Sequence, residues 1–144
     1  LEEEIEFVED YLALQKQLMD GELDYEIQTN ENIELDKIQI PHSLIYTFTE
    51  NAIKHGLRPK EKDRKINIDI TKDQGRVKIS IQDNGVGRKR SKELKTTDTG
   101  QGMVIVKNII EGYNKLHGGN ISYQVEDVLE DSGVVSGTLV EIWI

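Results

Sequence analysis

Hydrophobic positions in the first third of the chain predict a helix followed by a strand. Residues 2–20 carry apolar side chains at the helical period, and Gly21 follows as a helix stop. The apolar stripe consists of Ile5, Val8, Leu12 and Met19. Residues 22–28 alternate between apolar and polar side chains, which predicts a strand. Residues 29–40 follow neither period, so we expect a loop there.

The middle of the chain predicts one helix and a hairpin. Pro41 suits the first turn of a helix, which we expect to run to about Arg58. Apolar and polar residues then alternate over residues 65–70 and again over residues 76–83. The turn sequence KDQG lies between these runs, so the two strands should pair antiparallel.

The last third predicts a long loop, a helix and two strands. Residues 84–99 have little apolar content, and a third helix is expected to start near Gly100. Alternating runs at residues 121–125 and 137–144 predict the last two strands. Helices and strands are therefore interleaved along one domain, residues 1–144. This order predicts an α/β fold, a two-layer sandwich in which three helices cover one face of a mixed five-stranded sheet.

Composition narrows the class of protein. The chain has 144 residues, of which 36% are hydrophobic, and no apolar run approaches the ~20 residues of a membrane span. The net charge of -9 argues against nucleic-acid binding, which needs a basic surface. Without cysteine there are no disulfides or thiolate metal sites, as suits a reducing compartment. Because the sequence starts at Leu1 rather than Met, we interpret it as part of a longer protein.

The predicted central helix has one apolar and one polar side. At about 100° per residue, Ile45, Phe48, Ala52 and Ile53 share one side. The opposite arc contains Thr47, Glu50, Asn51, Lys54, His55 and Arg58. Such an arc is either an ordinary solvated face or the floor of a binding site.

Asp83 is the second candidate. By strand parity it continues the inward row of Ile79 and Ile81, and a carboxylate buried there without a partner would cost several kcal/mol. The following Gly85 and Gly87 permit a ligand to approach the backbone. The alternative is that Asp83 is simply a turn residue, since Asp-Asn-Gly favours turns.

A glycine-flanked helix start is the third candidate. The sequence TGQGM at residues 99–103 would expose free N–H groups at the positive end of a helix, which favours anions. The preceding stretch is locally basic, which suits a polyanionic ligand. An ordinary flexible helix start and a solvated run of charges are the alternatives.

Taken together, the three motifs resemble the ATP-binding domain of the superfamily that contains gyrase, the heat-shock chaperone ATPase, histidine kinases and MutL. The sequence IP…FTENAIKHGL is similar to sensor histidine kinases of the LytS-like group. Residues 1–27 are similar to the stretch that follows the phosphoacceptor helices there. The resemblance covers essentially the whole chain and implies a Bergerat-type ATP-binding fold.

The resemblance also implies a role for each motif residue. Asn51 would hold the Mg²⁺ that bridges the ATP phosphates, Lys54 would neutralise phosphate, and His55 would lie against the base or ribose. Asp83 would accept the adenine amino group, and Thr138 would lie beneath the adenine. Glu50 would be a catalytic base or an orienting residue. The glycines and helix start that would approach the nucleotide are Gly85, Gly87, Gly100, Gln101, Gly102 and Met103, and residues 88–99 would form a mobile lid.

Two positions depart from the pattern of the superfamily. Thr47 stands where hydrolytic members carry a glutamate, which argues against water activation of the gyrase kind. Ile105 stands where an asparagine is frequent, which removes one phosphate-side contact. His42 follows Pro41 and does not match a phosphoacceptor motif, so the phosphoacceptor histidine is expected on another segment.

The function implied is that of the catalytic domain of a two-component sensor histidine kinase. It would bind ATP and Mg²⁺ and transfer the γ-phosphoryl group to a histidine on a separate domain of the same protein or its dimer partner. A response regulator would be the next partner, and the domain would be the cytoplasmic part of a membrane-anchored sensor. The alternatives are a degenerate, non-catalytic nucleotide-binding module and an ATP-hydrolysing clamp.

Overall fold

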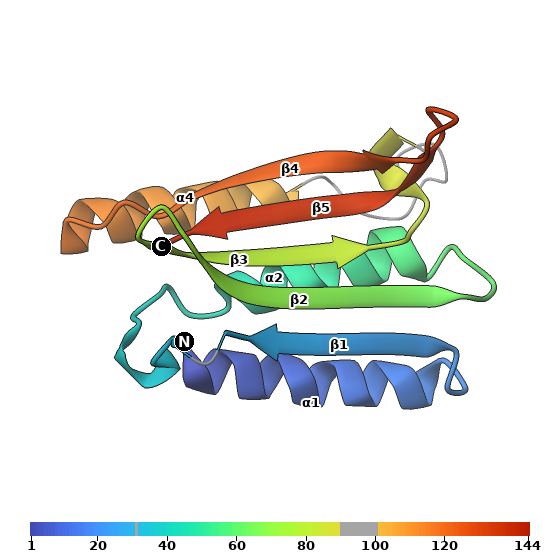
Figure 1. Ribbon diagram of the computed structural model, residues 1–144, viewed down its shortest axis with the longest axis horizontal. Helices are drawn as coiled ribbons and strands as arrows, with labels where there is room; N and C mark the ends of the chain where they lie inside the picture. The colour runs from blue at the N-terminus through green and yellow to red at the C-terminus, as the bar shows by residue number, and fades with distance from the viewer. Residues whose placement is uncertain (31, 90–100) are drawn as a thin grey trace.

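The protein folds around a single five-stranded sheet (Figure 1). The structure, a computed structural model, describes residues 1–30, 32–89 and 101–144. The strands are β1 (Leu23–Thr29), β2 (Arg64–Asp73), β3 (Arg76–Asp83), β4 (Ser122–Leu129) and β5 (Val135–Trp143). Their spatial order is β1-β2-β3-β5-β4; β1 pairs parallel to β2, and every other pair is antiparallel. The predicted mixed sheet and the predicted antiparallel pairing of β2 with β3 are confirmed.

The helices form the second layer. They are α1 (Glu2–Leu18), α2 (Leu44–Asn51) with its continuation η2 (Ala52–Leu57), and α4 (Gln101–His117); a short 3₁₀ turn, η1, covers Leu35–Lys37. Helix α2 contacts both α1 and α4, and α1 also packs on β1. In Figure 1, α2 and α4 lie behind the sheet, while α1 runs alongside β1. The two-layer sandwich expected from the sequence is therefore confirmed.

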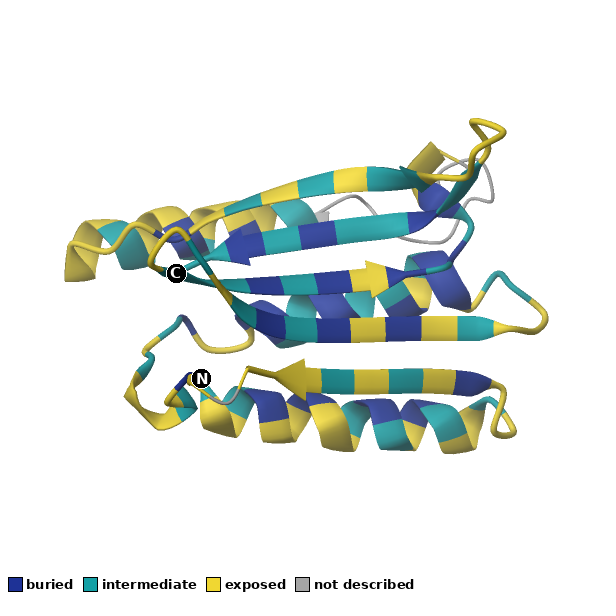
Figure 2. Ribbon diagram, viewed as in Figure 1, coloured by how far each residue is buried: buried dark blue, intermediate teal, exposed yellow. Residues whose placement is uncertain are grey.

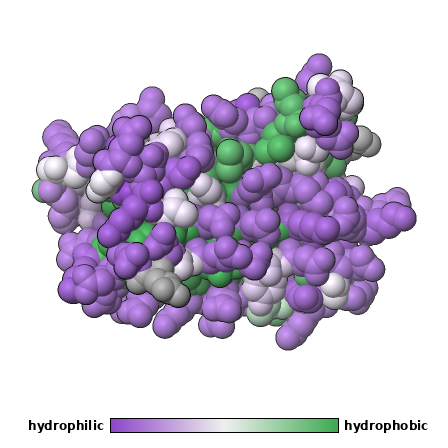
Figure 3. Space-filling model, in the orientation of Figure 1, coloured by the Kyte–Doolittle hydropathy of each residue, from purple (hydrophilic) through white to green (hydrophobic). Residues whose placement is uncertain are grey.

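The core lies between the two layers. Ile66, Ile68 and Ile70 of β2 and Ile79 and Ile81 of β3 are essentially inaccessible to solvent. Their neighbours point the other way, which gives the alternating bands on β2 and β3 in Figure 2. The face of the sheet seen in Figure 3 is mostly hydrophilic. One apolar row per strand is therefore enough to hold the helices on a single side.

The central helix begins later than the sequence predicts. Helix α2 starts at Leu44, so placing Pro41 in its first turn was wrong. Ser43 takes a left-handed conformation (φ 62°) and makes no side-chain cap. The cap comes from Glu4 of α1, whose carboxylate accepts the backbone N–H groups of Ser43, Ile45 and Tyr46 at 2.8, 2.8 and 3.1 Å. A carboxylate here satisfies orphan donors at the positive end of the helix dipole.

We expect Glu4→Ala to destabilise the fold by about 1–3 kcal/mol, because several helix-start N–H groups lose their acceptor. Chemical denaturation, monitored by circular dichroism, measures the loss in the free energy of unfolding. Glu3→Ala is the matched control, since Glu3 is exposed in the same turn of α1. Equal stability of the Glu4 and Glu3 variants would contradict a capping role for Glu4.

The second half of the central helix is a π-helix rather than an α-helix. Ala52–Leu57 forms η2, and the N–H of Arg58 donates to the carbonyl oxygen of Ile53, five residues earlier, at 2.9 Å. This widening shifts the side chains after Ala52 around the helix, so the 100° wheel used for the sequence fails there. Single π-turns inside helices are frequently found at functional sites.

The remaining elements agree with the sequence apart from their ends. The strand expected at residues 121–125 continues to Leu129 in β4, and the last strand begins at Val135. Residues 87–89, expected in the long loop, make a helical turn, while residues 90–100 lie outside the described part of the chain. Among the described residues, no helix has the length and apolar character needed to cross a bilayer.

Candidate functional site

Asp83 lies at the C-terminal end of β3, with its side chain in the buried row. It is 5% exposed and continues the row of Ile79 and Ile81, which are 0% and 1% exposed. Strand parity therefore predicted its orientation correctly. One carboxylate oxygen, Oδ1, accepts the N–H of Gly85 at 2.7 Å. This is the local turn bond expected if Asp83 were only a turn residue, so the burial is what distinguishes this aspartate.

Two glycines make room for the Asp83 carboxylate. A Cβ on Gly56 would lie 2.7 Å from Oδ1 of Asp83, and a Cβ on Gly85 would lie 2.4 Å from the backbone of Gly56. The N–H of Val86 donates to the carbonyl oxygen of Gly56 at 3.0 Å. The end of the π-helix and the turn after β3 therefore touch backbone to backbone, and only glycine fits at either position.

The last strand closes the other side of Asp83. Thr138 of β5 is its register partner across the antiparallel β3–β5 pair. A Cβ on the neighbouring Gly137 would lie 1.9 Å from the backbone oxygen of Asp83, so β5 also needs a glycine here. The predicted base-binding residues Asp83, Gly85 and Thr138 are thus brought together at one end of the sheet.

Burial sets the protonation state of Asp83. Desolvation raises the pKa of its carboxyl to about 6, although hydrogen bonds from the backbone at Gly85 and Thr138 and the charge of Lys60 oppose the rise. Asp127 adds a smaller repulsion that raises the pKa further. Asp83 is therefore mainly ionised at neutral pH and can act as a hydrogen-bond acceptor there.

Asn51 meets the start of α4. Its side-chain oxygen lies 3.3 Å from the position that a Cβ on Gly102 would take, and its amide nitrogen lies 4.0 Å from the sulfur of Met103. Helix α4 begins at Gln101, so the free N–H groups of its first turn lie close to Asn51. The resemblance to the ATPase superfamily assigned Asn51, Gly102 and Met103 to one site. In the structure these three residues are neighbours.

Glu50 joins Lys54 and Tyr46 in one polar group. Its Oε1 atom lies 2.8 Å from the ammonium of Lys54 and accepts the hydroxyl proton of Tyr46 at 3.2 Å. Burial, together with the negative charge of Glu50, raises the pKa of Tyr46. The nearby Tyr11 has its pKa raised to about 12, chiefly by burial and then by Tyr46 and Glu50. The ion pair with Glu50 thus holds Lys54 on the polar side of the central helix.

The other predicted site residues are less informative. His55 is half-buried within η2, beside Lys54. Gly87 has a positive φ of 77°, and a Cβ there would lie 2.3 Å from the Val135 side chain, so strand packing alone requires glycine. Gln101 opens α4, while Gly100 and the predicted lid beyond Lys89 lie outside the described residues.

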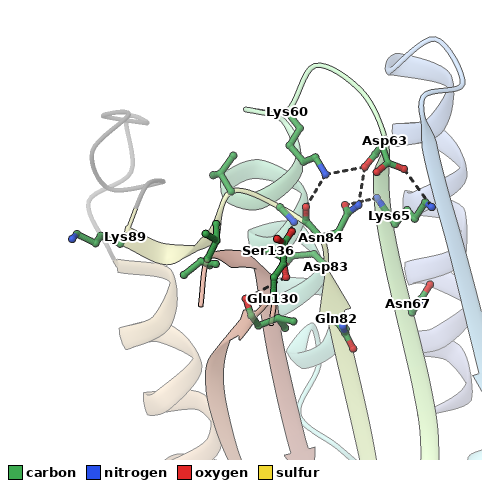
Figure 4. Close-up of a pocket in the computed structure, with 15 residues that line it drawn as sticks. Lys60, Asp63, Lys65, Asn67, Gln82, Asp83, Asn84, Lys89, Glu130 and Ser136 are labelled. Carbon is green, nitrogen blue, oxygen red and sulfur yellow. Dashed lines mark hydrogen bonds and ion pairs between the residues drawn. The ribbon is translucent and has the colours of Figure 1, made fainter. Parts of the chain in front are cut away.

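A pocket of about 840 Å³ lies at the same end of the sheet, largely on its outer face (Figure 4). Its lining includes Asn67 and Gln82, whose strand neighbours are buried in the core. Of the predicted site residues that the structure describes, Asp83 and Gly85 alone line it. We therefore place the candidate site on the helical side, where Asn51, Gly56 and Gly102 gather, rather than in this pocket.

Sequence reasoning missed two glycines and one lysine. Gly56 and Gly137 lie so close to Asp83 that a Cβ on either would clash with it. Lys60 donates to the backbone oxygens of Asp63 and Asn84 at 2.9 and 2.8 Å, as Figure 4 shows. A glycine inside a helix costs about 1 kcal/mol relative to alanine, so Gly56 in KHGL was a readable signal of close packing. Lys60 lies in a polar loop and gave no such signal.

Comparison with known proteins identifies the family. The model for histidine kinase-, DNA gyrase B- and HSP90-like ATPases matches residues 36–144. The sensor protein LytS of Streptococcus mutans is 32% identical over 127 residues, which is 82% of this chain and 21% of that protein. LytS of Bacillus subtilis is 29% identical over 87 residues, 60% of this chain. The chain spans 14% of the length of that B. subtilis relative.

Solved structures agree on the fold. The nucleotide-free catalytic domain of histidine kinase ThkA superposes with a TM-score of 0.63 at 19% identity, covering 100% of this chain and 92% of that one. The mycobacterial sensor histidine kinase MprB superposes with a TM-score of 0.61 at 17% identity, covering 97% and 92%. On the match over residues 36–144, the chain belongs to the family of histidine kinase-, DNA gyrase B- and HSP90-like ATPases, with LytS sensor proteins among its relatives.

Proposed function

We propose that residues 1–144 form the catalytic domain of a two-component sensor histidine kinase. The domain binds Mg-ATP and transfers the γ-phosphoryl group to a histidine on a separate phosphoacceptor segment. Membership of the ATPase family and the likeness to LytS sensor proteins support this proposal. The single observation that carries it is the buried Asp83 carboxylate, enclosed by Gly56, Gly85 and Thr138.

The base end of the nucleotide belongs to Asp83 in this proposal. An ionised carboxylate accepts the hydrogen bond of the adenine amino group and repels the carbonyl oxygen that guanine presents there. Gly85 allows close approach, Thr138 lies beneath the ring, and His55 lies against the base or ribose. The burial that raises the pKa of Asp83 also makes this contact selective, because water competes poorly for it.

The phosphate end belongs to Asn51, Lys54 and the start of α4. The amide oxygen of Asn51 is a hard ligand of the kind Mg²⁺ prefers, and this ion typically takes few protein ligands beside phosphate and water. When bound, Mg²⁺ neutralises and aligns the phosphate oxygens. Lys54 adds a positive charge, and the backbone N–H groups at Gln101, Gly102 and Met103, together with Gly100, receive the phosphates.

In the transfer step, a ring nitrogen of the acceptor imidazole attacks the γ-phosphorus with its lone pair. The bond from that phosphorus to the β–γ bridging oxygen breaks, ADP leaves with the electron pair, and the imidazole gives up its other ring proton. Glu50 is suited to receive that proton or to orient the ring, because its carboxylate is held by Lys54 and Tyr46. The protein contributes mainly positioning and charge stabilisation.

The partners follow from this chemistry. The phosphoacceptor segment comes from the same protein or its dimer partner, and a response regulator takes the phosphoryl group next. A related fold supports this sequence of partners, since histidine kinase ThkA has been solved in complex with the response regulator TrrA. The domain would work on the cytoplasmic side of a membrane-anchored sensor.

The test is nucleotide binding by calorimetry, followed by phosphoryl transfer from ATP to a supplied phosphoacceptor domain. We expect ATP to bind in the micromolar range or more weakly (about -8 kcal/mol or less favourable) and GTP to bind at least about ten-fold more weakly. Equal affinity for GTP would remove Asp83 from the adenine contact. ATP binding without transfer would support the degenerate, non-catalytic module instead.

The pKa of Asp83 predicts how ATP affinity depends on pH. Because this pKa is raised to about 6, the acceptor form is lost as pH falls through 6. The ionised fraction drops from about nine-tenths at pH 7 to about one-tenth at pH 5, so ATP affinity should fall about ten-fold. Calorimetry at both pH values measures this change. Asp83→Asn should bind ATP weakly at both, and a pH slope retained in that variant would assign it to another group.

A further inference from the structure

Helix α1 carries an exposed apolar strip beside the candidate site. Phe7, Leu14 and Leu18 are 55%, 52% and 65% exposed, and the half-buried Tyr11 lies between them. We call these four residues the α1 strip. The buried residues of α1 are Ile5, Val8, Leu12 and Gln15, and Tyr11 packs partly against the same core. Large apolar side chains gathered on one exposed helix face mark an interaction surface.

The spacing of the α1 strip selects a helix as its occupant. Phe7, Tyr11, Leu14 and Leu18 are separated by four, three and four residues, which is the 3.5-residue period of a helix-to-helix seam. A sheet edge or an extended peptide would not match this period over the three turns from Phe7 to Leu18. The occupant therefore presents its own apolar residues at the same spacing.

Acidic residues beside the α1 strip indicate the charge of the helix that would bind there. On a wheel of about 100° per residue, Glu3 and Asp10 border the strip on the side away from the core, and Glu6 lies beyond them. The matching positions near the end of α1 are Ala13 and Gln17, which carry no charge. A second α1 would bring the same acids to this border, so self-pairing leaves them unmatched. A helix with basic flanking residues complements them.

The other edge of the strip reaches Glu50. The Tyr46 ring lies 5.1 Å, centroid to centroid, from the rings of both Phe7 and Tyr11. The hydroxyl of Tyr46 donates to Oε1 of Glu50 at 3.2 Å. Two aromatic contacts and one hydrogen bond therefore connect the strip to the proposed catalytic carboxylate. A helix seated on the strip runs alongside the polar arc of α2.

We propose that the α1 strip docks a helix of the phosphoacceptor region, one with apolar residues at heptad spacing and a basic flank. The proposal rests on the proposed function, because only phosphoryl transfer requires a histidine to approach Glu50. Docking along α1 sets the angle at which that helix meets α2. The strip thus selects the phosphoacceptor segment, while Asp83 and the glycines around it select the nucleotide.

The test measures docking directly and without nucleotide. The probe is the phosphoacceptor region of the S. mutans LytS sensor. Titration calorimetry gives its affinity for the full 144-residue chain, and amide shifts in NMR spectra locate the contact. We expect the largest shifts at Phe7, Leu14 and Leu18.

Two pairs of substitutions make the test specific. Leu14→Asp with Leu18→Asp should weaken probe binding about ten-fold or more. Leu116→Asp with Leu129→Asp is the matched control, since these leucines are 81% and 60% exposed on α4 and β4, and affinity should stay within about two-fold of the parent. Glu3→Lys with Asp10→Lys should also weaken binding, whereas Glu9→Lys, off the strip, should not.

The results separate this proposal from the proposed function. Probe docking at the strip in a chain that binds no ATP would uphold the surface and remove the kinase assignment. ATP binding and transfer that are unaffected by the Leu14 and Leu18 substitutions would uphold the kinase assignment and remove the docking surface. Absence of probe binding to the parent, or shifts confined to the exposed Val104 and Ile105 of α4, would overturn the proposal. Dimerisation that these substitutions abolish would assign the strip to a second copy instead.

Discussion

Asn51→Ala is expected to abolish phosphoryl transfer while leaving adenosine binding nearly unchanged. The amide oxygen of Asn51 is the proposed protein ligand for Mg²⁺, and it lies beside Gly102 at the phosphate end of the site. Asp83 and Thr138, which would hold the base, come from β3 and β5 instead. The loss should therefore reach about 10²-fold or more in transfer, since in-line displacement depends on the metal to align the phosphates.

The measurement compares ATP and adenosine binding to parent and variant, each with Mg²⁺ and with a chelator. The parent should bind ATP more tightly with Mg²⁺, and the variant should lose that difference. Lys107→Ala is a suitable control, because Lys107 is exposed on α4 and pairs with the nearby Glu111, at 3.7 Å. If Asn51→Ala retained the Mg²⁺ dependence of the parent, Asn51 would be an ordinary helix residue and its stability effect would stay within about 0.5 kcal/mol.

Gly85→Ala is expected to remove nucleotide binding and to destabilise the fold by about 1–3 kcal/mol or more. The added methyl group would lie 2.4 Å from the Cα and carbonyl carbon of Gly56, so one backbone must move away from the other. That movement breaks the hydrogen bond from Val86 to Gly56 and displaces the Asp83 carboxylate, which Gly85 itself holds at 2.7 Å. Thermal unfolding and calorimetry with ATP measure the two losses.

Gly112→Ala is the matched control for that variant. Gly112 lies within α4, and a Cβ there would meet nothing within 4 Å. Alanine gains up to about 1 kcal/mol over glycine inside a helix, so this change should leave binding intact and raise stability. Equal loss of ATP binding in both variants would mean that the contact between Gly85 and Gly56 does not shape the site.

The period of the apolar residues was sufficient to predict the architecture, because each helix and strand buries one apolar row. Strand alternation placed Ile79, Ile81 and Asp83 on the inner face, and all three are buried there. The start of α2 was wrong because its cap comes from Glu4, about forty residues earlier, where no local rule could find it. The π-helix was missed because the wheel assumes a constant 100° per residue, and the close approach of its Gly56 to Gly85 is a contact between two separate elements.

The site was partly predictable for the same reason. The sequence motifs identified Asn51, Asp83 and Gly102 as site candidates, and the fold places them at one end of the molecule. The ion pair between Glu50 and Lys54 follows from a four-residue helical spacing and was within reach of the sequence. The clearance that Gly137 gives to Asp83 was not, because it depends on which residue of β5 faces the end of β3.

The pairing of β1 with β2 has a consequence for how far this domain can be shortened. The matched family region starts at residue 36, after α1 and β1. A chain cut there would leave the long, isoleucine-rich β2 as an unprotected edge strand, open to pairing with other molecules, and α2 would lose its Glu4 cap. Aggregation of such a shortened protein would thus follow from the loss of its first two elements, even though every motif residue for the nucleotide is still present.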